Sequence, residues 1–308
     1  MDPPGVRFRL AAAGDVRAAA QIAAAALADL RVGQKGEPDT CPGEALVPVF
    51  AHLVRHDGPR FWLAEHEDRV VGCGAGLERG TLWFLAALFV LPEFQGLGVG
   101  RGLLERAMEG RPRAGGVAAV LSSASNPVSN GLYARRSMCP LMPAINLAGR
   151  LPGDLRRPAM AGLDVAPLSA GDMEALRAVD AGVVGFDRTV DHSWLLLEAR
   201  RRGWLFRRQD RAAGYAYVGG DGTEGAGAVG PVAALRARDS ETIVRFVLAE
   251  LAGQGATGAC LYVPGANLRV QRLLWAAGFG FEGSAGLLGA SRPFGRFDRY
   301  VFAGDALM

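Results

Sequence analysis

Short apolar segments of strand length alternate along the chain with Ala-rich stretches of helical period. In the first half, a short strand leads into a helix opened by Asp15, and a hairpin and a long apolar strand follow. A helix, a further strand and a last helix come next. The expected strands of this half are 7–10, 61–65, 70–77, 82–90 and 117–122. The pattern predicts an α+β unit, a mixed and mostly antiparallel sheet flanked by helices.

The second half repeats this order, so the chain contains two copies of one unit. Trp62 and Leu63 recur as Trp204 and Leu205, and the Asp-Arg turn and the Gly that follow them recur at the same offset of 142 residues. The expected strands of this half are 164–168, 204–208, 212–218, 226–233 and 258–263. The first copy carries extra residues in the Gly/Pro-rich stretch 33–48. We expect one domain over 1–150, a Pro/Gly/Arg-rich linker over 151–162 and a second domain over 163–308.

Composition restricts the class of protein. The longest dense apolar run, 82–91, is about half of the ~20 residues that a membrane-spanning helix needs, and the first ten residues lack the pattern of a signal peptide. The net charge is +3, with both signs spread over both halves, which is unlike a nucleic-acid-binding module. The four cysteines are scattered and read as reduced thiols rather than a disulfide or zinc framework. We therefore expect a cytoplasmic protein without a metal, a membrane segment or a nucleic-acid partner.

The strongest chemical signal follows the long apolar strand of the first half. After Pro92 the chain runs through Gln95-Gly96-Leu97-Gly98-Val99-Gly100 into a helix. Such a turn directs several backbone N–H groups into one concavity at the positive end of a helix, which suits an anion. Glycines are useful there because a Cβ would obstruct the approach of a phosphate to the backbone.

Glycine richness alone is weak evidence, because a chain with 43 glycines contains accidental clusters, and a purely structural turn remains open. Two other nucleotide motifs do not fit. A Walker loop needs Gly-Lys-Ser/Thr, and the only lysine is Lys35. A Rossmann motif needs an acidic residue about 20 residues further on, and 117–123 contains none.

The segment resembles the signature motif of the GNAT superfamily of acetyl-CoA-dependent N-acyltransferases, and the order of elements extends the resemblance over 6–150. The resemblance implies a three-layer GNAT fold and acetyl-CoA as co-substrate. The strand end would pair with the pantetheine arm and receive the acetyl group, and the loop would bind the diphosphate. The residues so assigned to cofactor binding are Leu88, Phe89, Val90, Gln95, Gly96, Leu97, Gly98, Val99, Gly100 and Arg101.

A second family motif is matched by Asn126, just after the next strand, and by Tyr133 on the helix beyond it. The resemblance places Asn126 at the cofactor and makes Tyr133 the acid that protonates the departing thiolate. An unperturbed phenol has a pKa near 10, so it carries its proton at neutral pH. The alternative for Tyr133 is a core aromatic. The chain departs from the family at Ser137-Met138, where Gly-Phe is usual.

No general base is readable, because 81–90 contains no carboxylate or histidine. Glu65, His66 and Glu78 flank the expected cleft, but each is interpreted as a solvated turn or strand-end residue. A water chain or bulk solvent is the alternative acceptor of the proton. Likewise, a helix start with surface charges is expected at Asp187-Arg188 and Asp191-His192.

The second copy lacks the loop. The offset of 142 places Gln95 to Gly100 on 237–242, which holds no glycine and adds Asp239 and Glu241, and it places Tyr133 on Trp275. We expect a degenerate domain that packs beside the first and walls the acceptor cleft. The alternative is that Gly230-Pro231-Val232 supports CoA by a different geometry.

The sequence thus predicts an N-acetyltransferase that acts on a small-molecule or peptide amine, as a monomer or homodimer. Two alternatives stay open. One is an acyl-CoA-binding sensor or pseudoenzyme that regulates a partner. The other is an acyltransferase with a longer acyl donor or a hydroxyl acceptor.

Overall fold

The computed structural model describes residues 3–35, 43–109, 115–220, 225–304 and 306–307. Part of the predicted insertion, 36–42, lies outside these residues. The chain divides into two compact units, which are described one at a time. The first unit contains 1–120 and 131–138, and the second contains 121–130 and 139–308.

The first unit is built on a sheet in which the strands follow chain order. Its first four strands pair antiparallel, and the fifth joins the fourth in parallel. The strands are β1 (Val6–Leu10), β2 (Phe61–His66), β3 (Arg69–Arg79), β4 (Leu82–Val90) and β5 (Val117–Ser123). The helices are α1 (Val16–Lys35), α2 (Gly43–Asp57), α3 (Val99–Ala107) and α4 (Pro127–Ala134). Strand β5 ends, and helix α4 begins, in residues that are grouped with the second unit.

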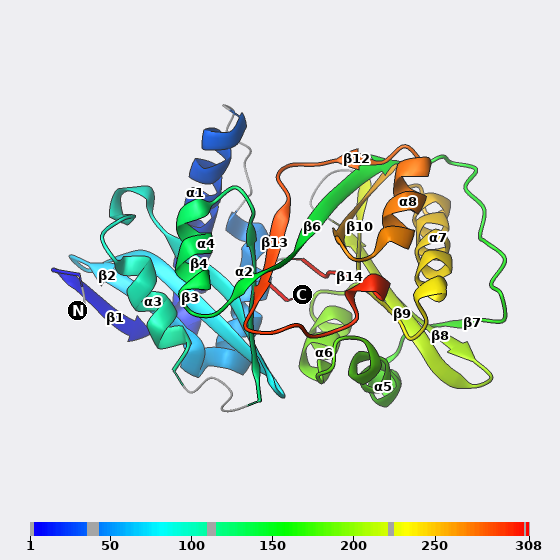
Figure 1. Cartoon of the computed structure of the whole chain (residues 1–308), viewed down its shortest axis with the longest axis horizontal. Helices are drawn as coiled ribbons and strands as arrows, with labels where there is room; N and C mark the ends of the chain where they lie inside the picture. The colour runs from blue at the N-terminus through cyan, green and yellow to red at the C-terminus, as the bar shows by residue number, and fades with distance from the viewer. Residues whose placement is uncertain (1–2, 36–42, 110–114, 221–224, 305, 308) are drawn as a thin grey trace. The chain divides into compact units, whose positions relative to one another are not determined.

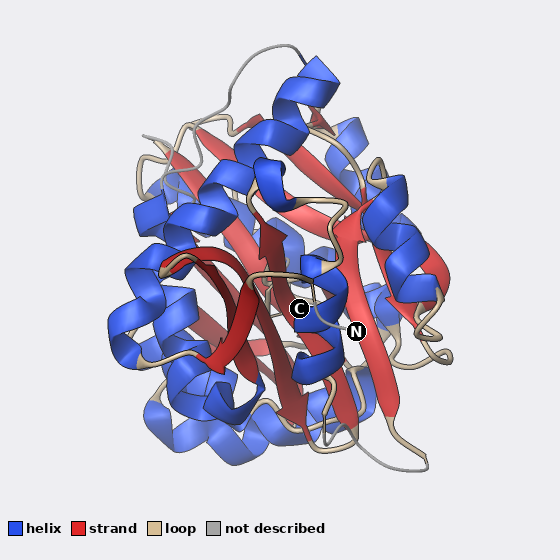
Figure 2. Ribbon diagram, turned by 90° about the vertical axis from the view of Figure 1, so that its left-hand side faces the viewer, coloured by secondary structure: helices blue, strands red, loops and turns tan. Residues whose placement is uncertain are grey.

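Helices cover both faces of the β2–β3–β4 sheet (Figure 2). On one face, the thiol of Cys73 in β3 donates to the carbonyl of Ala19 in α1, at 3.8 Å. On the other face, a Cβ at Gly74 would lie only 3.1 Å from the Cβ of Leu103 in α3. A Cβ at Gly102 of α3 would lie 2.5 Å from the ring of Phe8. These glycines therefore let α3 approach the sheet closely, which fixes where this helix begins.

The second unit repeats the order, as the sequence predicts (Figure 1). Its first four strands are again antiparallel, and the next is parallel to the fourth. The strands are β7 (Asp164–Pro167), β8 (Arg202–Arg208), β9 (Arg211–Gly220), β10 (Ala226–Ala234) and β11 (Gly258–Pro264). The helices are α5 (Met173–Val183), α6 (Thr189–Leu197), α7 (Ala237–Gly253) and α8 (Leu268–Ala276).

The last strand of the first copy, β6 (Cys139–Arg150), is grouped with the second unit. It pairs antiparallel with β11 along 258–264, and on its other edge with β12 (Gly280–Phe281) and β13 (Gly286–Ala290). The sequence repeat places β6 with the residues that precede it, whereas packing groups it with the strands that follow. Leu151, at the start of the predicted linker, is buried in the core of the second unit together with Leu163.

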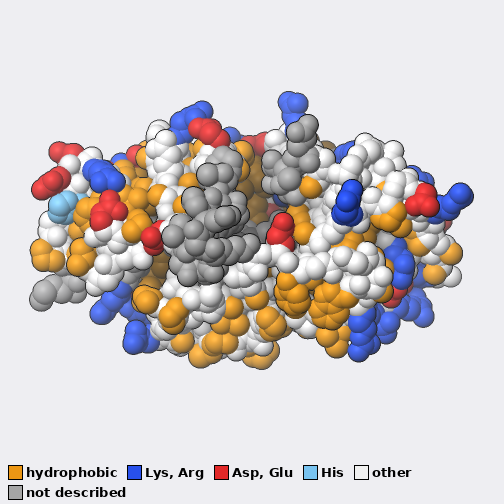
Figure 3. Space-filling model, turned by 90° about the horizontal axis from the view of Figure 1, so that it is seen from above, with side chains coloured by type: hydrophobic (Ala, Val, Ile, Leu, Met, Phe, Trp, Pro, Cys, Tyr) orange, Lys and Arg blue, Asp and Glu red, His pale blue; other side chains and the backbone are white. Residues whose placement is uncertain are grey.

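Both signs of charge are interspersed on the face shown in Figure 3, in keeping with the net charge of +3. Among the helices that the structure describes, none combines the length and the apolar character needed to cross a membrane.

Candidate cofactor site

Strands β4 and β5 stop pairing before the glycine loop, and we call the place where they separate the fork of the first copy. The parallel pairing joins Leu82–Leu85 to Val117–Val120. Immediately beyond it, Ala86 is an extra residue in β4, because Ala75 and Gly76 of β3 face Ala87 and Leu85. A bulge of this kind bends a strand and ends its pairing on one side. Strand β4 continues to Val90, and in the described part of the chain its pairing with β5 does not extend past Leu85.

The end of β4 runs directly into the glycine loop. Leu88 and Phe89 are half-buried, and they remain paired to β3 opposite Gly74 and Cys73. After a short 3-10 turn, Pro92–Phe94, the side-chain amide of Gln95 donates to the carbonyl of Val90 at 3.0 Å. Gln95 thus fastens the loop to the strand end, and its side chain is committed to the backbone.

Two glycines of the loop have a backbone conformation that other residues rarely adopt. Gly96 has φ +76° and Gly98 has φ +89°, and Gly98 is the N-cap of α3. The first helical hydrogen bond runs from the amide of Gly102 to the carbonyl of Gly98, at 3.0 Å. The amides before Gly102 therefore belong to the first turn, where a helix has no carbonyl partner for them. Residues 95–98 are exposed, so this positive helix end faces the surface.

The remaining predicted loop residues have distinct roles in the structure. Val99 is buried and anchors α3 in a core cluster with Leu103, whereas Leu97 is 60% exposed. A Cβ at Gly100 would make only an ordinary contact, 3.6 Å from Val90. The exposed Arg101 donates to Glu105 one turn further along α3, at 3.1 Å.

Asn126 and Tyr133 mark the two ends of α4. The side-chain oxygen of Asn126 accepts from the amide of Ser129 at 3.1 Å, which caps the helix. Tyr133, 6% exposed, lies in a core cluster with Leu85, Leu104 and Met138, against which the half-buried Leu88 packs. Tyr133 is therefore packed in the core, in a cluster that the end of β4 contacts through Leu88, and its role as an acid stays a prediction.

The departure at Ser137-Met138 changes residue types but keeps the local geometry. Ser137 has φ +69°, a value that favours glycine, and Met138 is 1% exposed in the same core cluster as Tyr133. In the second copy, Gly278 at φ +83° and the buried Phe279 occupy the corresponding turn.

The acidic residues near the site are bound to arginines. Glu65 on β2 accepts from Arg7 and Arg9, both at 2.6 Å, and is 7% exposed. The hydrogen bond from Arg9 is the main reason that the pKa of Glu65 is lowered, and Arg7 adds to it against the effect of burial. The expectation of a solvated Glu65 is therefore wrong. Glu78 pairs with Arg60, and the half-buried His66 packs on the ring of Phe94, 5.2 Å between centroids.

Comparisons with known proteins fit this geometry. Residues 24–138 match the model of the acetyltransferase (GNAT) family. This part of the chain is therefore similar to a GNAT acetyltransferase domain. Similarity to that family indicates acyl transfer from an acyl-CoA to an acceptor. No curated protein matches the chain.

Solved structures show the same fold over nearly the whole chain. A proposed acetyltransferase from Pyrococcus horikoshii is 17% identical, with 100% of this chain and 98% of that chain covered and a TM-score of 0.76. A GCN5-related N-acetyltransferase from Sphaerobacter thermophilus is 18% identical, with 97% and 100% covered and a TM-score of 0.66. A tandem GNAT protein from the clavulanic acid biosynthesis pathway is 17% identical, with 94% and 99% covered and a TM-score of 0.58. At these identities the likeness concerns the fold, which is a GNAT fold in two tandem copies.

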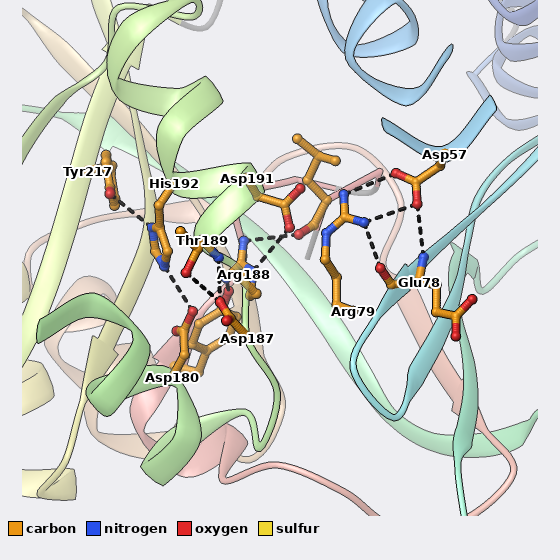
Figure 4. Close-up of polar contacts among 12 residues, drawn as sticks. Asp57, Glu78, Arg79, Asp180, Asp187, Arg188, Thr189, Asp191, His192 and Tyr217 are labelled. Carbon is orange, nitrogen blue, oxygen red and sulfur yellow. Dashed lines mark hydrogen bonds and ion pairs between the residues drawn. The ribbon is translucent and has the colours of Figure 1, made fainter. Parts of the chain in front are cut away.

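A buried ion pair in the GNAT domain was missed from the sequence (Figure 4). Arg79, at the end of β3, donates to both carboxylate oxygens of Asp57, at the end of α2, at 3.0 and 3.1 Å. Asp57 also accepts from the amide of Glu78 at 3.1 Å. The pair joins α2 to the sheet. A lone arginine at the end of an apolar strand was the only signal, and nothing in the sequence named its partner.

The second GNAT copy contains a buried polar cluster where surface charges were expected (Figure 4). Arg188, Asp191 and His192 are each at most 1% exposed, so that expectation is wrong. His192 lies 2.8 Å from Asp180 and 2.9 Å from the hydroxyl of Tyr217, and Tyr215 donates to Asp180. In the described part of the chain, no group of three or more His, Cys, Asp or Glu side chains is arranged to hold a metal.

The second copy also differs at the start of its helix. Residues 237–242 are part of α7 itself, with no loop before them. Asp239 is 3% exposed there, and its carboxylate accepts from Arg208 of β8 at 3.2 Å. The first turn of α7 therefore carries a buried acidic residue that is paired with an arginine of β8.

Proposed function

We propose that the first GNAT copy binds acetyl-CoA and that the protein transfers its acetyl group to a primary amine of a small-molecule or peptide acceptor. One observation carries the proposal. A bulged strand edge, a loop with two left-handed glycines and an exposed helix N-terminus follow one another over 86–101. These are the backbone features that suit a ligand with an extended arm joined to a diphosphate.

The residues present fit such a cofactor. The first-turn amides of α3 and the loop over 95–101 would bind the diphosphate, assisted by Arg101, and Leu88–Val90 would bind the arm. Asn126 is assigned to the same site, although its side-chain oxygen is shared with the cap of α4. Bound acetyl-CoA supplies a thioester, which is an activated acyl group.

The proposed chemistry is direct attack of the amine on the thioester carbonyl. Backbone amides near the bulge at Ala86 would polarise the carbonyl. Tyr133 would return a proton to the sulfur of the leaving thiolate, since its position in the core beside Leu88 brings it to the end of β4. Tyr133 would then have two roles, as an acid and as a residue of the core.

The amine would lose its proton without a dedicated carboxylate base. The hydrogen bond from Arg9 is the main cause that lowers the pKa of Glu65, so this carboxylate is poorly suited to accept a proton near neutral pH. Glu78 is engaged in an ion pair with Arg60. We assign this step to water, and the rate should therefore follow the fraction of acceptor amine that is unprotonated.

The test is an assay of thiol release from acetyl-CoA in the presence of a panel of primary amines, with acetylated products identified by mass spectrometry. The proposal expects product with at least one amine class and none with Gly100→Trp, which fills the space beside Val90. Gly253→Trp, where an added Cβ would meet nothing within 4 Å, is the matched control. Binding of acetyl-CoA without transfer to any amine would contradict the enzymatic role.

The second candidate function is an acyl-CoA-binding sensor or pseudoenzyme that regulates a partner. The arginine-bound carboxylates Glu65 and Glu78 favour it, because they leave no evident base. Tight binding that persists without thiol release would support it. Competition among CoA thioesters in the same assay distinguishes acetyl from longer acyl donors, and alcohols added to the panel test hydroxyl acceptors.

Three further proposals accompany this function. The first copy, over 1–150, supplies the cofactor site and the chemistry, and the copy over 163–308, joined by 151–162, is degenerate. The protein is cytoplasmic. It is a monomer or a homodimer.

A further inference from the structure

The second copy reproduces the fork of the first copy. Parallel pairing joins β10 to β11 over Ala226–Val229 and Gly258–Leu261, and it ends there. An extra residue then enters β10, because Val229 and Val232 face Val218 and Ala216 of β9. In the first copy, the pairing ends at Leu85 and the extra residue is Ala86. The two copies therefore share both the bulge and the point at which the parallel strands stop pairing.

In the second copy, a segment near the C-terminus pairs with both arms of this fork. Strand β14 (Tyr300–Val301) is antiparallel to β10, with Val301 opposite Val232. The next residue, Phe302, bridges to Tyr262 of β11, and its amide donates to the Tyr262 carbonyl at 2.9 Å. The segment thus supplies the backbone hydrogen bonds that the two strands no longer give each other.

The segment fills the fork tightly. Tyr300, Val301 and Phe302 are each at most 1% exposed. A Cβ built on Gly230, beside the bulge, would lie 2.1 Å from the carbonyl oxygen of Phe302. Gly230 is therefore a glycine because the backbone of the segment passes against it, and this strand end has no room for a second extended group.

Two polar side chains hold the segment. Asn267, the N-cap of α8, donates to the carbonyl of Tyr300 at 3.0 Å. The buried Arg188 donates to the hydroxyl of Tyr300 and, at 3.1 Å, to the carbonyl of Leu307. Arg188 lies 3.9 Å from Asp191, so its buried charge has a counter-ion. A buried arginine with three partners of this kind is costly to leave unsatisfied, which favours the docked segment.

The start of α7 is also occupied by the chain itself. Asp239 places a carboxylate at the helix N-terminus, and Arg208 pairs with it. In the first copy, the corresponding helix begins at exposed glycines. The second copy thus supplies an extended backbone from its own residues where the first copy leaves a strand edge, and its helix begins with a buried, paired acidic residue where the first copy has exposed glycines.

We propose that residues 300–302 are a built-in occupant of the second fork, so that the second unit folds without a cofactor and binds no acyl-CoA. The alternative use of Gly230-Pro231-Val232 as a CoA site is then excluded by the segment. The inference about the second unit stands apart from the proposed function, which concerns the first.

The test is hydrogen exchange read by mass spectrometry on the full chain, with and without saturating acetyl-CoA. We expect slow exchange over 226–234 and 299–304 in the free protein and no change on adding acetyl-CoA. Added protection over 226–234 and 258–264, or a second equivalent of binding, would overturn the proposal. If 95–102 shows no gain in protection, the proposed function fails while this inference stands.

A variant tests whether Arg188 holds the segment 300–302 in place. Arg188→Gln keeps a polar group but cannot reach all three partners, and we expect exchange over 299–304 to rise about tenfold, with acyl-CoA binding in the first copy unchanged. Arg245→Gln, on the surface of α7 beside Glu241, is the control and should leave exchange as in the wild type. Circular dichroism reports whether the variant is folded, and if it unfolds globally, Asn267→Ser replaces it. If a folded variant exchanges over 299–304 at the wild-type rate, Arg188 does not hold the segment in place.

Discussion

Asp57 and Arg79 form a two-pronged ion pair, with N–O distances of 3.0 and 3.1 Å, and at most 6% of either residue is exposed. Removal of Asp57 leaves the guanidinium of Arg79 buried without this carboxylate. We expect Asp57→Ala to lower the free energy of unfolding by about 3–5 kcal/mol. Urea denaturation measures the change. The double variant Asp57→Ala, Arg79→Met should recover part of the loss, and a double variant as unstable as the sum of the singles would contradict a direct pairing.

Acid should destabilise the first unit through Glu65. Its pKa in the folded state is lowered, chiefly by the hydrogen bond from Arg9, so the carboxylate contributes stability above its unfolded pKa. That contribution is lost as pH falls from the unfolded value towards the lowered folded value. Thermal unfolding at several pH values should show a smaller decline below about pH 5 for Glu65→Gln than for the wild type. Equal slopes for the two proteins would show that Glu65 does not titrate in this way.

Tyr133→Phe separates packing from chemistry, because it removes only the hydroxyl. We expect kcat to fall about 10²–10⁴-fold, with acetyl-CoA affinity and the melting temperature nearly unchanged. Steady-state kinetics on the best amine acceptor measure the effect. Tyr262→Phe in the second unit is the control and should retain activity. Full activity of Tyr133→Phe would show that Tyr133 packs the core and does not act as an acid.

The cluster around His192 should support stability and not catalysis. His192 contacts Asp180 and Tyr217 in a buried setting, so His192→Phe would remove this partner from one carboxylate oxygen of Asp180 and from the hydroxyl of Tyr217. We expect a loss of about 1–3 kcal/mol for each such group. Turnover per folded molecule should stay at the wild-type value. A folded His192→Phe protein with lower kcat would assign the cluster a role in the reaction.

Local patterns were readable from the sequence because they depend on neighbouring residues. The hairpins, the repeat, and the turn at Gly96 and Gly98 follow from alternation, offset and backbone conformation. The grouping of β6 with the second unit and the docking of Tyr300 depend on pairings between distant segments, which leave no local signal. The burial of Arg188 was missed for the same reason, since its partners Tyr300 and Leu307 lie more than a hundred residues away.

The most direct test of the account is a calorimetric titration of acetyl-CoA into the wild-type protein and into the Gly98→Trp, Gly100→Trp double variant. The account predicts one equivalent bound by the wild type, through the loop that begins α3, and none bound by the folded variant. Two equivalents, or binding that survives the substitutions, would place a site in the second copy and contradict both the assignment of the loop and the occupied fork.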